Sequence, residues 1–243
     1  MSQEPTIIQG GMGSGVSNWR LARAVSTRGQ MGVVSGTALD QILGWRLQDG
    51  DPGGHMRRAL AAFPVPAMAQ RVLDGYFIEG GKPAGAAYKR IPMPGIDAPP
   101  EVRELTVAAN FVEVWLAKEG HANPVGINYL DKLQLHHLPA TLGAMLAGVD
   151  YVLMGAGIPL RYPGVLDAFA KLEPAAYPLN VSGAQPGDDT LMRLDPRDYL
   201  GSGFPALKRP KFLAIVASNT LAQTMLKKAN GRVDGLVVEG PTA

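Results

Sequence analysis

The residues best suited to hold a ligand form one short glycine-rich stretch, the sequence GGMGSG at 10–15. It follows the extended-type residues 6–9 and precedes an amphipathic stretch over 16–27. Glycine has no Cβ, so its backbone can take positive φ and lie directly against a flat or phosphorylated ligand. A helix that starts beyond the loop would direct free N–H groups and a positive dipole end towards the same space. The pattern indicates a ligand-binding loop, with an ordinary strand-to-helix turn as the alternative.

Polar residues also stand where three later apolar stretches end. They are Asn128 in the stretch 124–130, Ser218 in 211–218, and Glu239 in 233–240. The carboxyl ends of parallel strands meet at one edge of a sheet, and active sites form there in barrel folds. We therefore expect these side chains to gather near the glycine-rich loop.

The four histidines are the candidates for general acid–base chemistry. His136 and His137 are adjacent and follow the strand predicted over 124–130. Neighbouring side chains on a helix point about 100° apart, so the two would rarely share one metal ion. A surface or helix-start position is favoured for both, and His136 is kept as a weak candidate for a catalytic base. The chain has no cysteine and no His–Glu spacing typical of zinc sites, so no metal site is predicted.

The composition is that of a globular protein with an ample core. Hydrophobic residues make up 46% and charged residues 18% of the 243 residues. The formal net charge is +2 and the basic residues are scattered, so neither nucleic acid nor an anionic membrane is a predicted partner. No apolar run reaches the ~18 residues of a membrane span, and the polar start lacks a secretion signal. We expect a cytoplasmic protein that acts on a small-molecule substrate.

Alternating strand-like and helix-like stretches predict an α/β fold, a TIM-type (β/α) barrel. Six strand-like stretches begin at 6, 31, 124, 151, 211 and 233. A closed barrel needs eight strands, so the prediction is an incomplete, C-terminally truncated barrel that forms a single domain over 1–243. Residues 67–100 and 176–207 are rich in Gly and Pro and are predicted to be irregular insertions, with 191–194 extended. Apolar residues at spacings of three and four predict a helix over 101–119.

Several motifs in these stretches form one recognisable set. They are IIQGGMG (7–13), LARAVS (21–26), GVVSG (32–36), VGINYL (125–130), GAMLAGVDYVLMGAGIP (143–159) and VDGLVVEGPTA (233–243). Together they resemble the nitronate monooxygenase family, also called 2-nitropropane dioxygenases. The match is specific within the motifs and weak in the two insertions.

The resemblance implies an FMN-dependent oxidoreductase that oxidises alkyl nitronates with O2. It implies FMN at the carboxyl ends of the barrel strands, in contact with Gly10, Gly11, Met12, Gly13, Asn128, Ser218, Glu239 and Gly240. The usual catalytic histidine of the family would follow residue 243. The resemblance therefore assigns no catalytic residue within this chain.

Two other functions stay open. A flavin-dependent enoyl-acyl-carrier-protein reductase would share the fold and the FMN but would use a nicotinamide reductant. A truncated, non-catalytic flavin-barrel fragment is the third reading, in which unpaired strand edges would favour a homo-oligomer. Bleaching of the flavin by a nitronate or by NADPH would separate the two enzymes.

Overall fold

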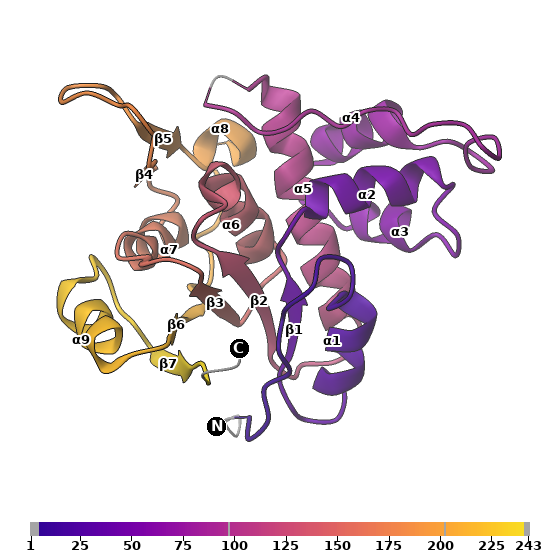
Figure 1. Ribbon diagram of the computed structural model, residues 1–243. Coiled ribbons are helices and arrows are strands. Elements are labelled where there is room, and N and C mark those ends of the chain that lie inside the picture. The colour runs from indigo at the N-terminus through magenta and orange to yellow at the C-terminus, as the bar shows by residue number, and fades with distance from the viewer. Residues whose placement is uncertain (1–4, 97, 202, 241–243) are drawn as a thin grey trace.

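A parallel five-stranded sheet runs through the centre of the protein, in the order β1-β2-β3-β6-β7 (Figure 1). The structure is a computed structural model that describes residues 5–96, 98–201 and 203–240. The central strands are β1 (Gly32–Ser35), β2 (Val125–Leu130), β3 (Tyr151–Gly155), β6 (Lys211–Val216) and β7 (Gly235–Val238). Every neighbouring pair among them is parallel. The strands therefore present all their carboxyl ends at one edge.

Helices connect these strands along the chain. They are α1 (Trp19–Ser26), α2 (Leu39–Gln48), α3 (His55–Ala61), α4 (Pro66–Tyr76), α5 (Pro100–Lys118), α6 (His137–Leu146), α7 (Tyr162–Ala170), α8 (Arg197–Leu200) and α9 (Asn219–Lys228), with a 3-10 turn η1 (Gln134–His136). Among the described residues, none of these helices combines the length and the apolar character needed to cross a membrane.

The two faces of the sheet are covered differently. Ile127, Val152 and Phe212 are fully buried in the same cluster as the apolar side chains of the helices. The alternate residues, such as Val33 and Leu153, belong to a second cluster that contains no described helix residue. Period-two alternation in the strands explains the division, because successive side chains point to opposite faces. Helices thus pack on one face, and the strands' own side chains fill the other.

The predicted α/β fold with parallel strands is confirmed, and successive βα units follow one another as they do in a barrel. The described strands form an open sheet, with Ile8 beyond β1 at one edge and β7 at the other. The prediction of a full first strand at residues 6–9 was wrong in extent. Ile8 forms a single bridge to Met31, and the chain then turns into the glycine-rich loop at Gly10.

The insertion predicted over 67–100 begins with the helix α4, so the prediction that it is irregular was wrong for residues 67–76. Pro66 occupies the first turn of α4, where its fixed φ is favourable, and Met68, Ala69 and Val72 bury one face of the helix. Gly75 near the end of α4 gave a misleading turn signal. Residues 77–96 contain neither helix nor strand.

The insertion predicted over 176–207 is also partly regular. It contains most of a two-stranded antiparallel sheet, formed by β4 (Ala175–Pro178) and β5 (Leu191–Leu194), and the short helix α8. The expected extended conformation of 191–194 is confirmed. Tyr177, Met192 and Leu194 are buried, which anchors the hairpin to the helices of the main core. Figure 1 shows its turn projecting away from the rest of the molecule.

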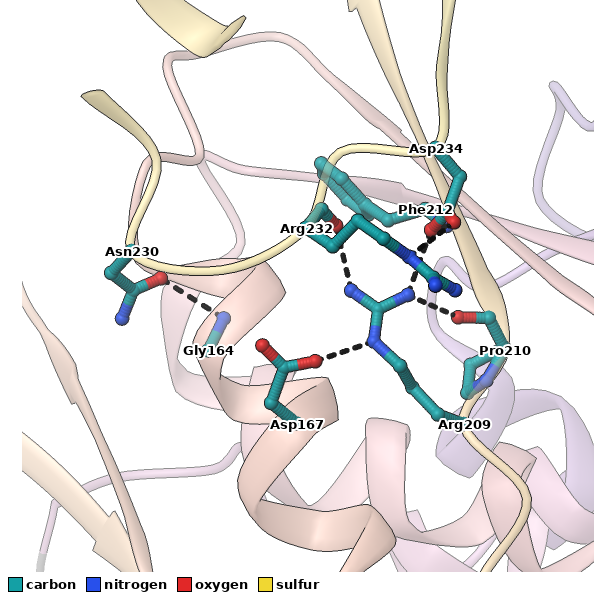
Figure 2. Close-up of polar contacts among 8 residues, drawn as sticks. All are labelled: Gly164, Asp167, Arg209, Pro210, Phe212, Asn230, Arg232 and Asp234. Atoms are coloured by element: carbon teal, nitrogen blue, oxygen red, sulfur yellow. Dashed lines mark hydrogen bonds and ion pairs between the residues drawn. The ribbon is translucent and has the colours of Figure 1, made fainter. Parts of the chain in front are cut away.

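Arg209 joins three elements at the amino ends of β6 and β7 (Figure 2). Its Nε donates to Asp167 Oδ1 of α7 at 2.5 Å, and its Nη1 donates to Asp234 Oδ2 at 2.7 Å. Its Nη2 donates to the carbonyl oxygen of Arg232 at 2.6 Å. Asp234 Oδ2 also accepts from the amide of Phe212 at 2.8 Å. The guanidinium therefore fixes α7 against the last two strands.

Arg209→Met is expected to lower the free energy of unfolding by about 2 kcal/mol, because it removes the partner of a mostly buried carboxylate. Asp234 is only 10% exposed, while its other partner Arg232 is 68% exposed. The matched control is Arg193→Met, which breaks an ion pair to Asp189 whose two side chains are 56% and 63% exposed. Urea unfolding should separate the two variants. Equal stability of the two would contradict the proposed importance of the Arg209 contacts.

Candidate functional site

The glycine-rich loop has its shape fixed by a buried serine. Ser17, 4% exposed, donates to the carbonyl oxygen of Met12 at 2.6 Å and lies 3.0 Å from the carbonyl oxygen of Gly10. Gln9 supports this serine, since its Nε2 donates to Ser17 Oγ at 3.2 Å. The side-chain oxygen of Gln9 accepts from the amide of Val33 at 3.0 Å, which ties the loop to β1. The carbonyl oxygens of Gly10 and Met12 thus accept hydrogen bonds from within the protein.

The amide groups of the same loop have no such partners. Within the described ranges, the N–H groups of Gly10, Gly11 and Met12 donate no hydrogen bond. Gly13 has a φ of +84°, so the chain turns sharply after Met12. A Cβ placed on Gly10 would have nothing within 4 Å, so space is open beside this residue. Successive unpaired N–H groups form a surface suited to an anionic or electron-rich ligand.

Gly11 brings the loop into direct contact with side chains of β1 and β2. A Cβ on this residue would lie 2.4 Å from Val33 Cγ1 and 2.8 Å from Asn128 Cβ, distances that no real Cβ adopts. Asn128 is 3% exposed, and its Nδ2 donates to Met12 Sδ at 3.5 Å and to the carbonyl oxygen of Tyr129 at 3.3 Å. The loop and Asn128 therefore lie together, as predicted. Their role towards a cofactor stays a prediction.

Ser218 and Glu239 follow the neighbouring strands β6 and β7, at the carboxyl edge of the sheet. The amide of Glu239 donates to the carbonyl oxygen of Val216 at 3.0 Å, so the ends of β6 and β7 are adjacent. Ser218 caps α9, and its Oγ accepts from the amide of Leu221 at 3.2 Å. Glu239 and Gly240 are exposed. Among the described residues, no hydrogen bond or ion pair links this pair to the glycine-rich loop.

His136 lies at the helix start predicted for it, at the end of η1. Its Nε2 is 3.6 Å from Asp40 Oδ2, a pairing that the sequence did not indicate. Asp40 belongs to the first turn of α2 and is 2% exposed. Its Oδ1 accepts from the amide of Gln41 at 2.9 Å, whereas Oδ2 has no hydrogen-bond partner in the part of the chain described. His136 is thus placed beside a buried carboxylate.

His137 belongs to a buried polar cluster that the sequence did not reveal. Its Nε2 donates to the carbonyl oxygen of Asp131 at 3.0 Å, and its ring meets the ring of Tyr177 edge-on at 4.9 Å. Tyr177 donates its hydroxyl to Asp131 Oδ1 at 2.5 Å. Burial lowers the pKa of His137 to about 4, and burial followed by the Asp131 hydrogen bond raises the pKa of Tyr177. Both groups are therefore neutral near pH 7.

Within residues 5–96, 98–201 and 203–240, no group of three or more His, Asp or Glu side chains is placed to hold a metal ion. No protein-family model matches the chain, and no curated protein matches it. The resemblance to nitronate monooxygenases therefore depends on the motifs themselves.

Proposed function

We propose that the chain is an FMN-dependent oxidoreductase of the nitronate monooxygenase type, built on a (β/α) barrel. One observation carries the proposal. Gly11 packs on Val33 and Asn128 where a Cβ cannot fit, while the amides of the same loop have no acceptor among the described residues. The electron-rich edge of a flat ring that lies on this loop would receive those hydrogen bonds. The motif resemblance supplies the identity of the ring as FMN.

Each residue would have a separate role towards the cofactor. The backbone of Gly10 to Gly13 would hold the ring system, and Asn128 would donate its amide to the ring or the substrate. Met12 is 57% exposed and contacts that amide, so it would give way as the ring enters. Ser218 and Glu239 with Gly240 would line the opposite side of the strand ends. When bound, FMN would carry electrons from an alkyl nitronate to O2.

The test is reconstitution of the purified chain with FMN. We expect saturable binding, seen as quenching of flavin fluorescence, and a stable yellow complex after gel filtration. Anaerobic addition of an alkyl nitronate should then bleach the absorbance of the flavin, and air should restore it. Oxygen consumption that depends on the nitronate would complete the assignment.

Two outcomes would contradict this assignment in different ways. Bleaching by NADPH but not by a nitronate would favour the enoyl reductase reading, because the cofactor would be right and the substrate wrong. If the purified chain retained no FMN, the flavin proposal itself would be wrong, and the hypothesis of a non-catalytic fragment would be favoured.

A further inference from the structure

A separate cleft lies beside the carboxyl end of β2, outside the loop assigned to FMN. Its volume is about 650 Å³, within the roughly 300–1,000 Å³ of small-molecule sites. The walls come from the irregular segment after α4, from the turn after β2 and from the loop after β4. Met93, Ile96 and Val181 line it and are 68%, 43% and 47% exposed. Three large apolar side chains thus stand in water at one place, where a hydrocarbon chain would cover them.

The same cleft carries two basic side chains, Lys132 and His136. Lys132 is exposed, and no carboxylate of the described residues lies within 4.0 Å of its Nζ. Among the described residues, no acidic side chain lines the cleft. An apolar wall with a basic end is complementary to a molecule that has a hydrocarbon chain and an anionic head.

Asp40 lies next to His136 but outside the lining of the cleft. Its Oδ2 is buried, has no hydrogen-bond partner among the described residues and lies 3.6 Å from His136 Nε2. A buried polar atom without a partner is costly, so the carboxylate favours a position of the His136 ring that keeps this nitrogen nearby. Asp40 therefore holds the ring of His136 at the cleft. Asp40 does not line the cleft and acts through His136 as a positioning residue.

We propose that this cleft binds a medium-chain aliphatic anion. The hydrocarbon chain lies against Met93, Ile96 and Val181, and the anionic head lies at Lys132 and His136. The site needs no flavin. If the proposed function also holds, the cleft would select nitronates with long alkyl chains, and that extension alone rests on the proposed function.

Calorimetric titration of the full chain without FMN tests the site, with octanoate as the probe. Three other ligands serve as controls. Acetate has the carboxylate head without the long hydrocarbon chain, 1-octanol has the hydrocarbon chain without the charge, and octylammonium has the chain with a positive charge. We expect saturable binding of octanoate, at least about tenfold tighter than that of each of the other three, because chain and head both contribute. Equal affinity for octanoate and 1-octanol, or no binding of octanoate, would overturn the proposal. Because the titration contains no flavin, its result is independent of whether FMN binds.

Variants locate the ligand. Val181→Asp should weaken octanoate binding at least about tenfold, because it places a like charge on the apolar wall. Lys132→Gln should weaken it about threefold to fivefold, the scale of an exposed ion pair. Lys171→Gln is the matched control, since this exposed lysine lies at the C-terminal end of α7, away from the cleft. Unchanged affinity in Val181→Asp would place the ligand elsewhere and overturn the site.

A double-mutant cycle tests the positioning role of Asp40. His136→Gln should weaken octanoate binding, and Asp40→Asn should weaken it only while His136 is present. Additive losses in the double variant would show that Asp40 acts independently of His136. Thermal unfolding of each variant confirms that the fold is retained before the titrations are compared.

Discussion

Gly11→Ala is expected to weaken FMN binding by up to about 100-fold while the chain stays folded. The added Cβ would overlap Val33 Cγ1 at 2.4 Å and Asn128 Cβ at 2.8 Å, so the loop must move away from β1 and β2. Overpacking of this kind costs about 1–3 kcal/mol, which corresponds to a loss of up to about 100-fold in affinity. The loss falls on the ligand because the loop amides would leave the positions from which they bind it. Fluorescence titration with FMN measures the effect.

Gly75→Ala is the matched control for this prediction, because Gly75 lies in α4, outside the glycine-rich loop. A Cβ at Gly75 would meet nothing within 4 Å, and its φ is not positive. Its affinity for FMN should stay within about threefold of the parent, because the new methyl group has open space. Equal losses in the two variants would mean that close backbone packing at Gly11 does not govern binding.

The stability of the protein should fall between pH 6.5 and pH 4 by about 3 kcal/mol on account of one histidine. The pKa of His137 is lowered by burial from 6.5 to about 4 in the folded protein. Above pH 6.5 the imidazole is neutral in both states, so its full contribution is present. As the pH falls towards 4, His137 becomes protonated in the unfolded chain but stays neutral in the folded protein, so the free energy of unfolding decreases. Below pH 4 both states are protonated and this loss stops growing.

His137→Phe isolates the contribution of His137 to this pH dependence, because the variant keeps an aromatic ring and removes the titrating group. The free energy of unfolding, measured at pH 7 and pH 4, should differ between these values by about 3 kcal/mol less in the variant than in the parent. Carboxylates titrate in both proteins, so their effect cancels in the comparison. An NMR titration of the imidazole with a midpoint near 6.5 would refute the prediction.

Long, regular patterns in the sequence were sufficient to predict most of the architecture. The helix predicted over 101–119 is α5, Pro100–Lys118, because apolar residues recur at spacings of three and four over its whole length. The buried strands were equally clear, since each is a short apolar run between glycine or polar turns. α4 was missed because Gly75 and the prolines after it suggested turns, whereas the buried face of Met68, Ala69 and Val72 decides the structure.

The candidate site was predictable only where it lies on strand ends. Gly11 follows the bridge residue Ile8, and Asn128 lies in β2, so parallel pairing with β1 between them brings the two residues together. Asp40, in the first turn of α2, and His136, at the end of η1, meet through the tertiary fold, and no spacing in the sequence encodes that contact. Ser218 was predicted to lie beside the cofactor, and that role stays a prediction. The structure makes Ser218 the N-cap of α9.

The order of the strands never reverses across the sheet, and this has a consequence for how a ligand can be recognised. A doubly wound sheet opens a crevice where its two halves diverge, and its ligand enters there. A sheet wound in one direction has no such opening. A ligand must instead approach along the strand axes, and each βα unit contributes one loop to a common rim. Specificity can then change one loop at a time, while the glycine loop and the strands beneath it stay the same.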